Sequence, residues 1–355
     1  MKKLFLVMAC ALAVLAGCKK EDPKPDSGEN QEPTTMTGYA YLLNEGSWGS
    51  NNAEISRINL ASGTIEADWF SSANGRGLGD VAQDLVHYGN RLYCTVWNSN
   101  TLEIVDPVTG QSVKQISMGT RGPRSIACHE GKVYVSCYDK SVVRIDTTTL
   151  EIEATCPLSS MQPEQLCVAN GKLFVCSTWQ YNSASEAVYD SVLCVVDLAT
   201  FTEVGRIVVG TNPTRVCTLD DHRLLVTISE NNRTPHSAIV DLADGNRVSN
   251  VDIVTTGSAL YDGSIYHYAT AYDAEWNPTA TFYRTEINTL SPTPILQSHV
   301  RNLTNAYGIA VHPTTGHIFV CNSPYTSTGD VYCFTNAGEQ CWSCEAGMFP
   351  SRVVF

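Results

Sequence analysis

The feature that most constrains the fold is an internal repeat with a period of about 40 to 50 residues. Residues 123–135, PRSIACHEGKVYV, align without a gap with residues 163–175, PEQLCVANGKLFV. Each segment leads to a strand pattern that ends in an apolar residue and an aspartate, at 145–146 and 196–197, followed by a threonine-rich turn. A repeat of this length made of strands and turns predicts one supersecondary unit that packs on its neighbours.

Within the unit, the pattern is strand a, a glycine-containing turn, strand b, a variable loop, strand c, a turn and strand d. This order is typical of a four-stranded antiparallel blade. Strand a is predicted to start near seven positions: Leu85, Ile126, Leu166, Val216, Ser258, Ile309 and Val353. The sequence therefore predicts an all-β fold, a seven-bladed β-propeller that forms a single domain over residues 38–355.

The seventh start indicates how the ring closes. Residues 350–355, PSRVVF, repeat the opening of a blade, whereas residues 39–44, 54–60 and 64–70 resemble strands b, c and d without a strand a before them. We therefore expect Val353 to Phe355 to pair beside Tyr39 to Leu43, so that the C-terminal strand completes the N-terminal blade and satisfies both sheet edges.

The residues before the repeat carry targeting signals. Two lysines, a short apolar run over 4–16 and a cysteine after Ala16-Gly17 predict a signal peptide over 1–17, and the last part resembles a bacterial lipobox with Cys18 as the lipidated residue. Residues 18–37 are polar and proline-rich and predict a flexible tether. The run Lys19-Lys20-Glu21-Asp22 resembles the surface-export signal of Bacteroidota lipoproteins. We expect an outer-membrane lipoprotein on the cell surface, with the periplasmic face as the alternative.

Charge and cysteine usage narrow the possible ligands. The chain has a net charge of −13, so a groove for nucleic acid is not expected. Most of the 14 cysteines lie within apolar strand patterns, where free cysteine packs as a small hydrophobic residue. Cys341 and Cys344 could form a redox or metal pair, but residues three apart on a strand point to opposite faces, which favours a packing role.

The alternating strand directions predict that the b–c loops and the d–a connections share one face of the ring. These connections are longer than the turns on the other face and are rich in aromatic, amide and charged residues. Such a rim can bury a large, partly apolar ligand and satisfy its polar edge. From loop position alone, the candidate ligand-binding residues are Glu45, Trp48, Trp97, Asn98, Arg121, Tyr138, Asp139, Trp179, Tyr181, Arg215, Glu230, Trp276 and Tyr325.

The sequence contains no Gly-x-Ser-x-Gly elbow, no His-Glu-x-x-His and no glycine-rich phosphate loop. We therefore expect a non-catalytic protein with no catalytic residue, no catalytic cofactor and no bound metal. The alternative is a calcium-dependent propeller lyase or lactonase, in which Glu45, Asp139 and Glu230 would supply carboxylates at inner strand ends.

The lipobox, the repeat and the segment Asn44-Glu45-Gly46-Ser47-Trp48-Gly49 together resemble the YncE-like, YVTN-type seven-bladed propeller lipoproteins of Bacteroidota. Within that group, the Asn-Glu-Gly segment and the leader resemble the cobalamin-capture lipoproteins. The resemblance implies that one propeller face captures cobalamin or a related corrinoid and passes it to a TonB-dependent outer-membrane transporter. The same scaffold could instead bind a surface glycan or another nutrient.

Overall fold

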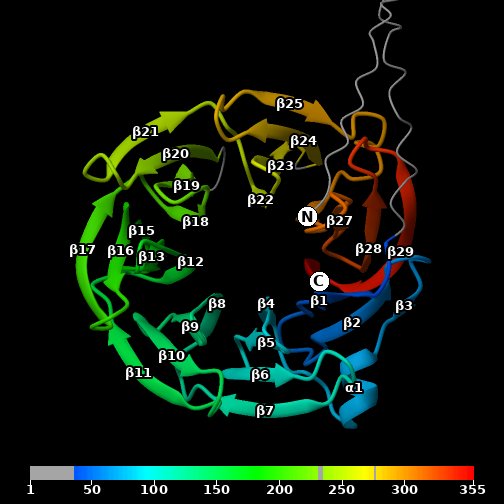
Figure 1. Cartoon of the computed structure of the whole chain (residues 1–355), viewed down its shortest axis with the longest axis horizontal. Coiled ribbons are helices and arrows are strands. Elements are labelled where there is room, and N and C mark those ends of the chain that lie inside the picture. The colour runs from blue at the N-terminus through cyan, green and yellow to red at the C-terminus, as the bar shows by residue number, and fades with distance from the viewer. Residues whose placement is uncertain (1–35, 231–234, 276) are drawn as a thin grey trace, which may run out of the picture. The chain divides into compact units, whose positions relative to one another are not determined.

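The computed structural model describes residues 36–230, 235–275 and 277–355. The predicted signal peptide, Cys18 and nearly all of the tether lie outside the described residues. The strands form seven four-stranded antiparallel sheets arranged in a ring, which confirms the seven-bladed prediction (Figure 1). Among the described residues, no helix has the length and apolar character needed to cross a membrane.

Blades 1 to 3 come from the first part of the chain, apart from the innermost strand of blade 1, and the strands of each blade are named from the innermost to the outermost. Blade 1 contains β30 (Pro350–Val354), β1 (Tyr39–Asn44), β2 (Glu54–Asn59) and β3 (Ile65–Glu66). Blade 2 contains β4 (Ala82–Tyr88), β5 (Arg91–Val96), β6 (Thr101–Val105) and β7 (Ser112–Ser117). Blade 3 contains β8 (Pro123–His129), β9 (Lys132–Cys137), β10 (Ser141–Asp146) and β11 (Ile152–Pro157).

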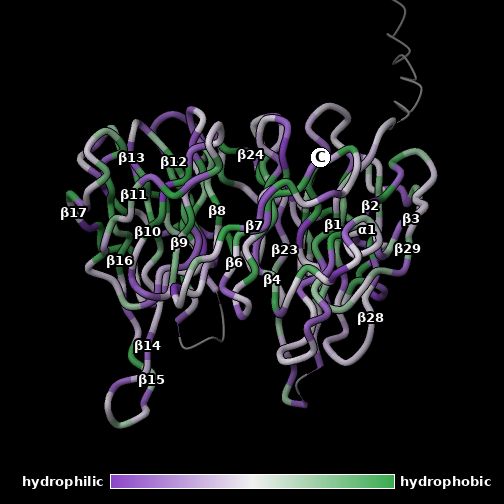
Figure 2. Tube along the Cα trace, turned by 90° about the horizontal axis from the view of Figure 1, so that it is seen from below, coloured by the Kyte–Doolittle hydropathy of each residue, from purple (hydrophilic) through white to green (hydrophobic). Residues whose placement is uncertain are grey.

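Blades 4 to 7 follow in the same order. Blade 4 contains β12 (Pro163–Ala169), β13 (Lys172–Ser177), β16 (Val192–Asp197) and β17 (Thr202–Val208). Between its second and third strands, β14 (Trp179–Tyr181) and β15 (Ala187–Tyr189) form a hairpin that projects from the ring (Figure 2). Blade 5 contains β18 (Pro213–Thr218), β19 (Arg223–Ile228), β20 (His236–Asp241) and β21 (Arg247–Val251). Blade 6 contains β22 (Gly257–Tyr261), β23 (Ser264–Tyr272), β24 (Pro278–Glu286) and β25 (Pro292–Ile295), and blade 7 contains β26 (Ala306–Val311), β27 (Ile318–Asn322), β28 (Thr328–Phe334) and β29 (Gln340–Met348).

The ring closes as the sequence predicts. Strand β30 pairs antiparallel with β1, with Leu42 opposite Val353 and Tyr41 opposite Val354. Blade 1 thus takes its innermost strand from residues about 300 positions away from its other three strands. The side chains of Leu42 and Val353 lie in the same buried apolar cluster, which joins blade 1 to blade 7.

A β-bulge lies at the start of the innermost strand in six blades. In β8, Pro123 pairs with Cys137 and Ile126 pairs with Val135, so two residues lie opposite a single residue of β9. Equivalent register shifts occur in β30, β4, β12, β18 and β26, whereas β22 pairs with β23 without one. The predicted starts of strand a fall one to three residues inside the observed strands, because regular alternation begins only after the bulge.

One strand prediction is wrong. Residues 64–70 do not form a single outer strand: β3 ends at Glu66, and the short helix α1 (Trp69–Asn74) follows. Trp69 therefore lies at the start of a helix, not on a strand. Trp69 and Phe70 are both buried, and the carboxylate of Glu54 accepts hydrogen bonds from the backbone N–H groups of Phe70 (2.9 Å) and Ser71 (3.2 Å). This carboxylate satisfies donors that the first helical turn leaves free.

The cysteines behave as core residues. Twelve lie within the part of the chain that the structure describes, none of them is in a disulfide, and seven are buried. Burial raises the pKa of Cys167 to about 12, which keeps this thiol protonated. Cys341 is exposed on β29 and Cys344 is partly buried, and no group of three metal-ligand side chains occurs among the described residues.

Candidate functional site

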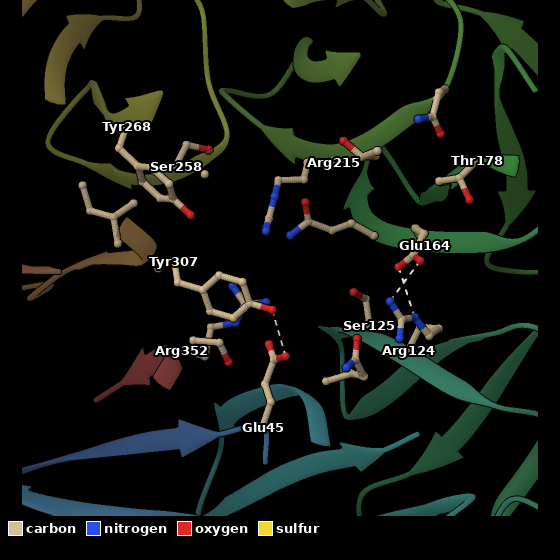
Figure 3. Close-up of a pocket in the computed structure, with 18 of the residues that line it drawn as sticks. Glu45, Arg124, Ser125, Glu164, Thr178, Arg215, Ser258, Tyr268, Tyr307 and Arg352 are labelled. Atoms are coloured by element: carbon tan, nitrogen blue, oxygen red, sulfur yellow. Dashed lines mark hydrogen bonds and ion pairs between the residues drawn. The ribbon is translucent and has the colours of Figure 1, made fainter. Parts of the chain in front are cut away.

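A cavity of about 300 Å³ lies where the innermost strands of the blades begin (Figure 3). The bulges explain its composition, because an added residue redirects side chains that a regular strand would place between the blades. Most of the side chains at the bulges line the cavity: Gln83, Arg124, Ser125, Glu164, Gln165, Thr214, Tyr307 and Ser351. The cavity is therefore polar and charged, although each blade behind it is apolar.

Two of the three arginines that line the cavity are paired with carboxylates. Arg124 of blade 3 donates from Nη2 and Nε to the two carboxylate oxygens of Glu164 of blade 4, at 3.0 and 3.2 Å. Arg352 of blade 1 donates from Nε to Oδ1 of Asp84 of blade 2, at 2.8 Å. Both pairs connect neighbouring blades and hold their guanidinium groups in fixed orientations.

Glu45 is a cavity carboxylate whose hydrogen-bond partner is a tyrosine and not an arginine. It follows β1, and its Oε2 accepts a hydrogen bond from the hydroxyl of Tyr307 at 3.0 Å. Burial raises the pKa of Glu45 to about 7, although the neighbouring hydroxyls of Ser351 and Tyr307 and the nearby charges of Arg124 and Arg215 oppose the rise. Near neutral pH this carboxyl therefore exchanges between a hydrogen-bond donor and an anionic acceptor.

Two tyrosines donate hydrogen bonds to carboxylates of the cavity. The hydroxyl of Tyr138 donates to Glu164, and that of Tyr307 donates to Glu45. Burial and the neighbouring carboxylates raise the pKa of both tyrosines far above the ordinary value, so both hydroxyls stay protonated.

A line of aromatic side chains runs from the rim to the cavity. Trp48, which is 77% exposed, meets Trp97 edge to face with ring centroids 6.4 Å apart, and Trp97 meets Tyr138 at 6.2 Å. The guanidinium of Arg124 lies 4.6 Å from the ring centre of Tyr138 and 5.7 Å from that of Trp97. The b–c loops of blades 1, 2 and 3 supply these rings, so this part of the predicted aromatic rim forms one connected surface.

The other predicted residues occupy several environments. Glu45, Trp179 and Arg215 line the cavity, and Tyr325 lies beside Tyr307 with ring centroids 5.6 Å apart. Two pairs contact the rest of the rim and not the cavity: Arg121 Nε with Asp139 Oδ2 (3.7 Å) and Asn98 Nδ2 with Asp80 Oδ2 (2.6 Å). Tyr181 packs on the cavity residue Trp179, with ring centroids 5.0 Å apart. Glu230 is exposed beside residues 231–234, and Trp276 lies outside the described residues.

Loop position alone does not identify the residues that form the wall of the cavity. It misses Arg124, Glu164, Gln165 and Arg352, which all lie among the first three residues of innermost strands. A signal for them was present, because four of the seven innermost strands begin with proline. Proline within a sheet is confined to edges, strand starts and bulges. The two residues after each of these prolines could thus have been predicted to lie at a bulge and to line the cavity.

Comparisons with known proteins agree with the fold. The family model described as "Domain of unknown function (DUF5074)" matches residues 38–355, and no curated protein matches the chain. Among solved structures, the chain is similar to a quinonprotein alcohol dehydrogenase-like protein from Bacteroides thetaiotaomicron (12% identity, TM-score 0.57, 90% of this chain and 78% of that chain covered). It is also similar to the Cps50 (Swd1) β-propeller domain of Myceliophteria thermophila (10%, 0.56, 79% and 90%) and to the hydrazine synthase of Kuenenia stuttgartiensis (14%, 0.56, 71% and 75%). Identities this low establish the fold and do not assign an activity.

Proposed function

This chain belongs to the DUF5074 family, whose function is unknown, and we propose that it is a non-catalytic ligand-binding protein. In this proposal the protein captures cobalamin or a related corrinoid. The observation that carries the proposal is the combination of an exposed aromatic rim with a charged, hydrogen-bonding cavity next to it. A corrinoid is a broad apolar macrocycle with amide side chains around its edge. Its two kinds of surface match the two parts of this site.

The rim supplies the apolar contact. Trp48 is exposed, and its neighbour Trp97 is held in place by Tyr138 and Arg124 behind it. Large aromatic rings held in fixed positions contribute contact area at a small cost in conformational entropy. A flat macrocycle can therefore cover these rings without a rearrangement of the backbone.

The cavity supplies polar partners for the amides. Glu45 and Gln165 offer acceptors, whereas Arg215, Gln83 and Gln165 offer donors. Bound amides that leave water require such partners, because an unsatisfied buried polar group costs about 1–3 kcal/mol. This requirement distinguishes a corrinoid from an apolar ring of similar size.

Titration calorimetry with cyanocobalamin tests the proposal directly. We expect binding to the propeller and a loss of affinity of at least about fivefold in Trp48→Ala, since removing a central aromatic contact typically costs about 1 kcal/mol or more. Tyr39→Ala is the matched control, because Tyr39 is also exposed on blade 1 but lies at the opposite end of β1. No heat of binding and no colour retained by the protein after desalting would refute corrinoid capture.

The cellular part of the proposal follows from the leader. We propose that Cys18 carries the lipid, that the protein stands on the outer face of the outer membrane, and that it delivers its ligand to a TonB-dependent transporter. Protease digestion of intact cells should remove the protein, and Cys18→Ala should release it from the membrane fraction. Protection of the protein in intact cells would place it on the periplasmic side instead.

A propeller lyase or lactonase is the second candidate, and one observation favours it. The pKa of Glu45 of about 7 is the value that a general acid or base requires near neutral pH. If a substrate is found, Glu45→Gln should abolish turnover while the variant retains substrate binding. Unchanged turnover in that variant would exclude Glu45 as the catalytic group.

A further inference from the structure

Arg215 differs from the other arginines of the channel. It lies on β18 directly after the bulge of blade 5, and its guanidinium extends toward the centre of the cavity (Figure 3). Arg124 and Arg352 are each bonded to a carboxylate, but within the described residues the Arg215 side chain has no ion-pair partner and no hydrogen bond. A half-buried guanidinium with unused donors is prepared for an anion from outside the protein.

A second cavity adjoins the first at this arginine. Its volume is about 290 Å³, and it shares Thr214, Arg215, Tyr268 and Tyr307 with the first cavity. Four tyrosines contribute to its wall: Tyr268, Tyr272, Tyr307 and Tyr325. The Tyr307 and Tyr325 rings meet edge to face at 5.6 Å, and Phe349 packs against both, so these rings form a fixed aromatic wall.

The second cavity also contains an unsatisfied polar atom. The hydroxyl oxygen of Thr270 is buried and has no hydrogen-bond partner within the described part of the chain. Buried polar groups in native proteins are nearly always satisfied by protein, water or ligand. The Thr270 oxygen has almost no solvent-accessible surface, so a polar group in the cavity could bond to it only after the cavity wall shifts.

The size of the cavities determines which part of a ligand fits. Cavities of about 300 Å³ are at the small end of the range for small-molecule pockets. A corrin ring with its amide side chains is too broad for either cavity and would stay at the aromatic rim. A narrower tail that ends in a planar ring can enter, with its anionic group at the junction of the two cavities.

We infer that Arg215 binds a phosphate ester of the ligand and that the tyrosine-walled cavity receives the aromatic group attached to it. This inference rests on the proposed function, and it assigns the orientation of the bound corrinoid. The phosphodiester of the cobalamin nucleotide tail contacts Arg215, the benzimidazole lies among the tyrosines, and the corrin ring covers Trp48 and Trp97.

Cobinamide provides the test, because it keeps the corrin ring and its amides but lacks the phosphate, the ribose and the base. Binding of cyanocobalamin and dicyanocobinamide is measured by calorimetry for the unmodified protein, Arg215→Met and Arg215→Lys. Arg247→Met is the control, since Arg247 lies on the outermost strand of the same blade. Melting temperatures of all variants establish that they are folded.

We expect Arg215→Met to weaken cobalamin binding about 10- to 100-fold, which is the range for losing hydrogen bonds to a charged group. Cobinamide binding should change less than about twofold, Arg215→Lys should keep part of the cobalamin affinity, and Arg247→Met should affect neither ligand. An equal loss of both affinities in Arg215→Met, or no loss, overturns the inference and leaves corrinoid capture intact. If the unmodified protein binds neither ligand, the proposed function fails and the inference fails with it.

Discussion

The carboxylate of Asp84 holds three blades together at the point of closure, and its replacement gives the sharpest test of the closure mechanism. Oδ1 accepts hydrogen bonds from Nε of Arg352 (2.8 Å) and from the backbone N–H of Leu85 (2.9 Å), and Oδ2 accepts from the backbone N–H of Ile126 (2.9 Å). The Asp84 side chain is 1% exposed and that of Arg352 is 36% exposed. The pair therefore joins blade 1 to blade 2, and the same carboxylate reaches blade 3.

Asp84→Asn keeps the shape of the side chain but removes the charge and replaces one acceptor with a donor. Breaking a buried ion pair costs about 3–5 kcal/mol, and the partial exposure of Arg352 places the expected loss at about 3 kcal/mol. With an unfolding entropy of about 2.1 cal/mol/K per residue over about 320 residues, the melting temperature should fall by about 4 to 5 °C.

Differential scanning calorimetry measures this shift. Glu66→Gln is the matched control, since it removes the carboxylate from the hydrogen-bonded but exposed pair Arg57–Glu66 and should cost no more than about 1 kcal/mol. In the double variant Asp84→Asn with Arg352→Met, much of the loss should be recovered, because no unpaired guanidinium remains. Equal small shifts for Asp84→Asn and Glu66→Gln would refute the assignment of closure stability to this pair.

Three further perturbations test other parts of the structure. Gly308→Ala should destabilise the fold by about 1–3 kcal/mol in urea unfolding, because the added Cβ would lie 2.0 Å from the backbone oxygen of Ser351. Gly205→Ala is the control and should leave the free energy of unfolding nearly unchanged, because its Cβ would meet no atom within 4 Å. The pKa of Glu45, raised from 4.5 to about 7, means that the folded state holds this proton more tightly than the unfolded state. The free energy of unfolding of the unmodified protein, measured relative to that of Glu45→Gln, should therefore fall by up to about 3 kcal/mol as the pH rises from 4.5 to 7. Above pH 7 the difference should stay level. A difference that does not change with pH would contradict the raised pKa. Phe70→Ala should cost about 3–5 kcal/mol by calorimetry, since the ring is fully buried, and a loss below about 1 kcal/mol would show that α1 does not contribute to the core.

The repeat made the architecture predictable, because each blade buries its strands in the same way and the pattern is copied along the chain. The closing strand was predictable for the same reason, since residues 350–355 match the opening of a blade. The helix after β3 was not, because Trp69-Phe70 has the same apolar character in a strand or a helix. The carboxylate of Glu54, which lies 16 residues before Phe70, caps the first turn of this helix, and the local apolar pattern does not reveal that contact.

The candidate site was predictable only in part. Aromatic loop residues such as Trp48 and Trp97 can be placed on one face by counting strands, and the structure joins them into a surface. The charged wall depends on a one-residue register shift at the start of most of the innermost strands, which alternation of apolar residues does not reveal. Pairs such as Arg124–Glu164 join different blades, so their geometry is a property of the closed ring.

The bulges separate ligand recognition from the stability of the scaffold, two properties that are coupled in most binding sites. Each bulged blade contributes one or two short segments to the channel, while its stability comes from ladders and apolar clusters farther out. A substitution at a bulged position whose side chain, among the described residues, bonds to no other blade, such as Gln83 or Thr214, can therefore alter the ligand that is recognised without weakening the scaffold. For this reason the residues that line the cavity can be changed one blade at a time, both by natural variation and by deliberate redesign.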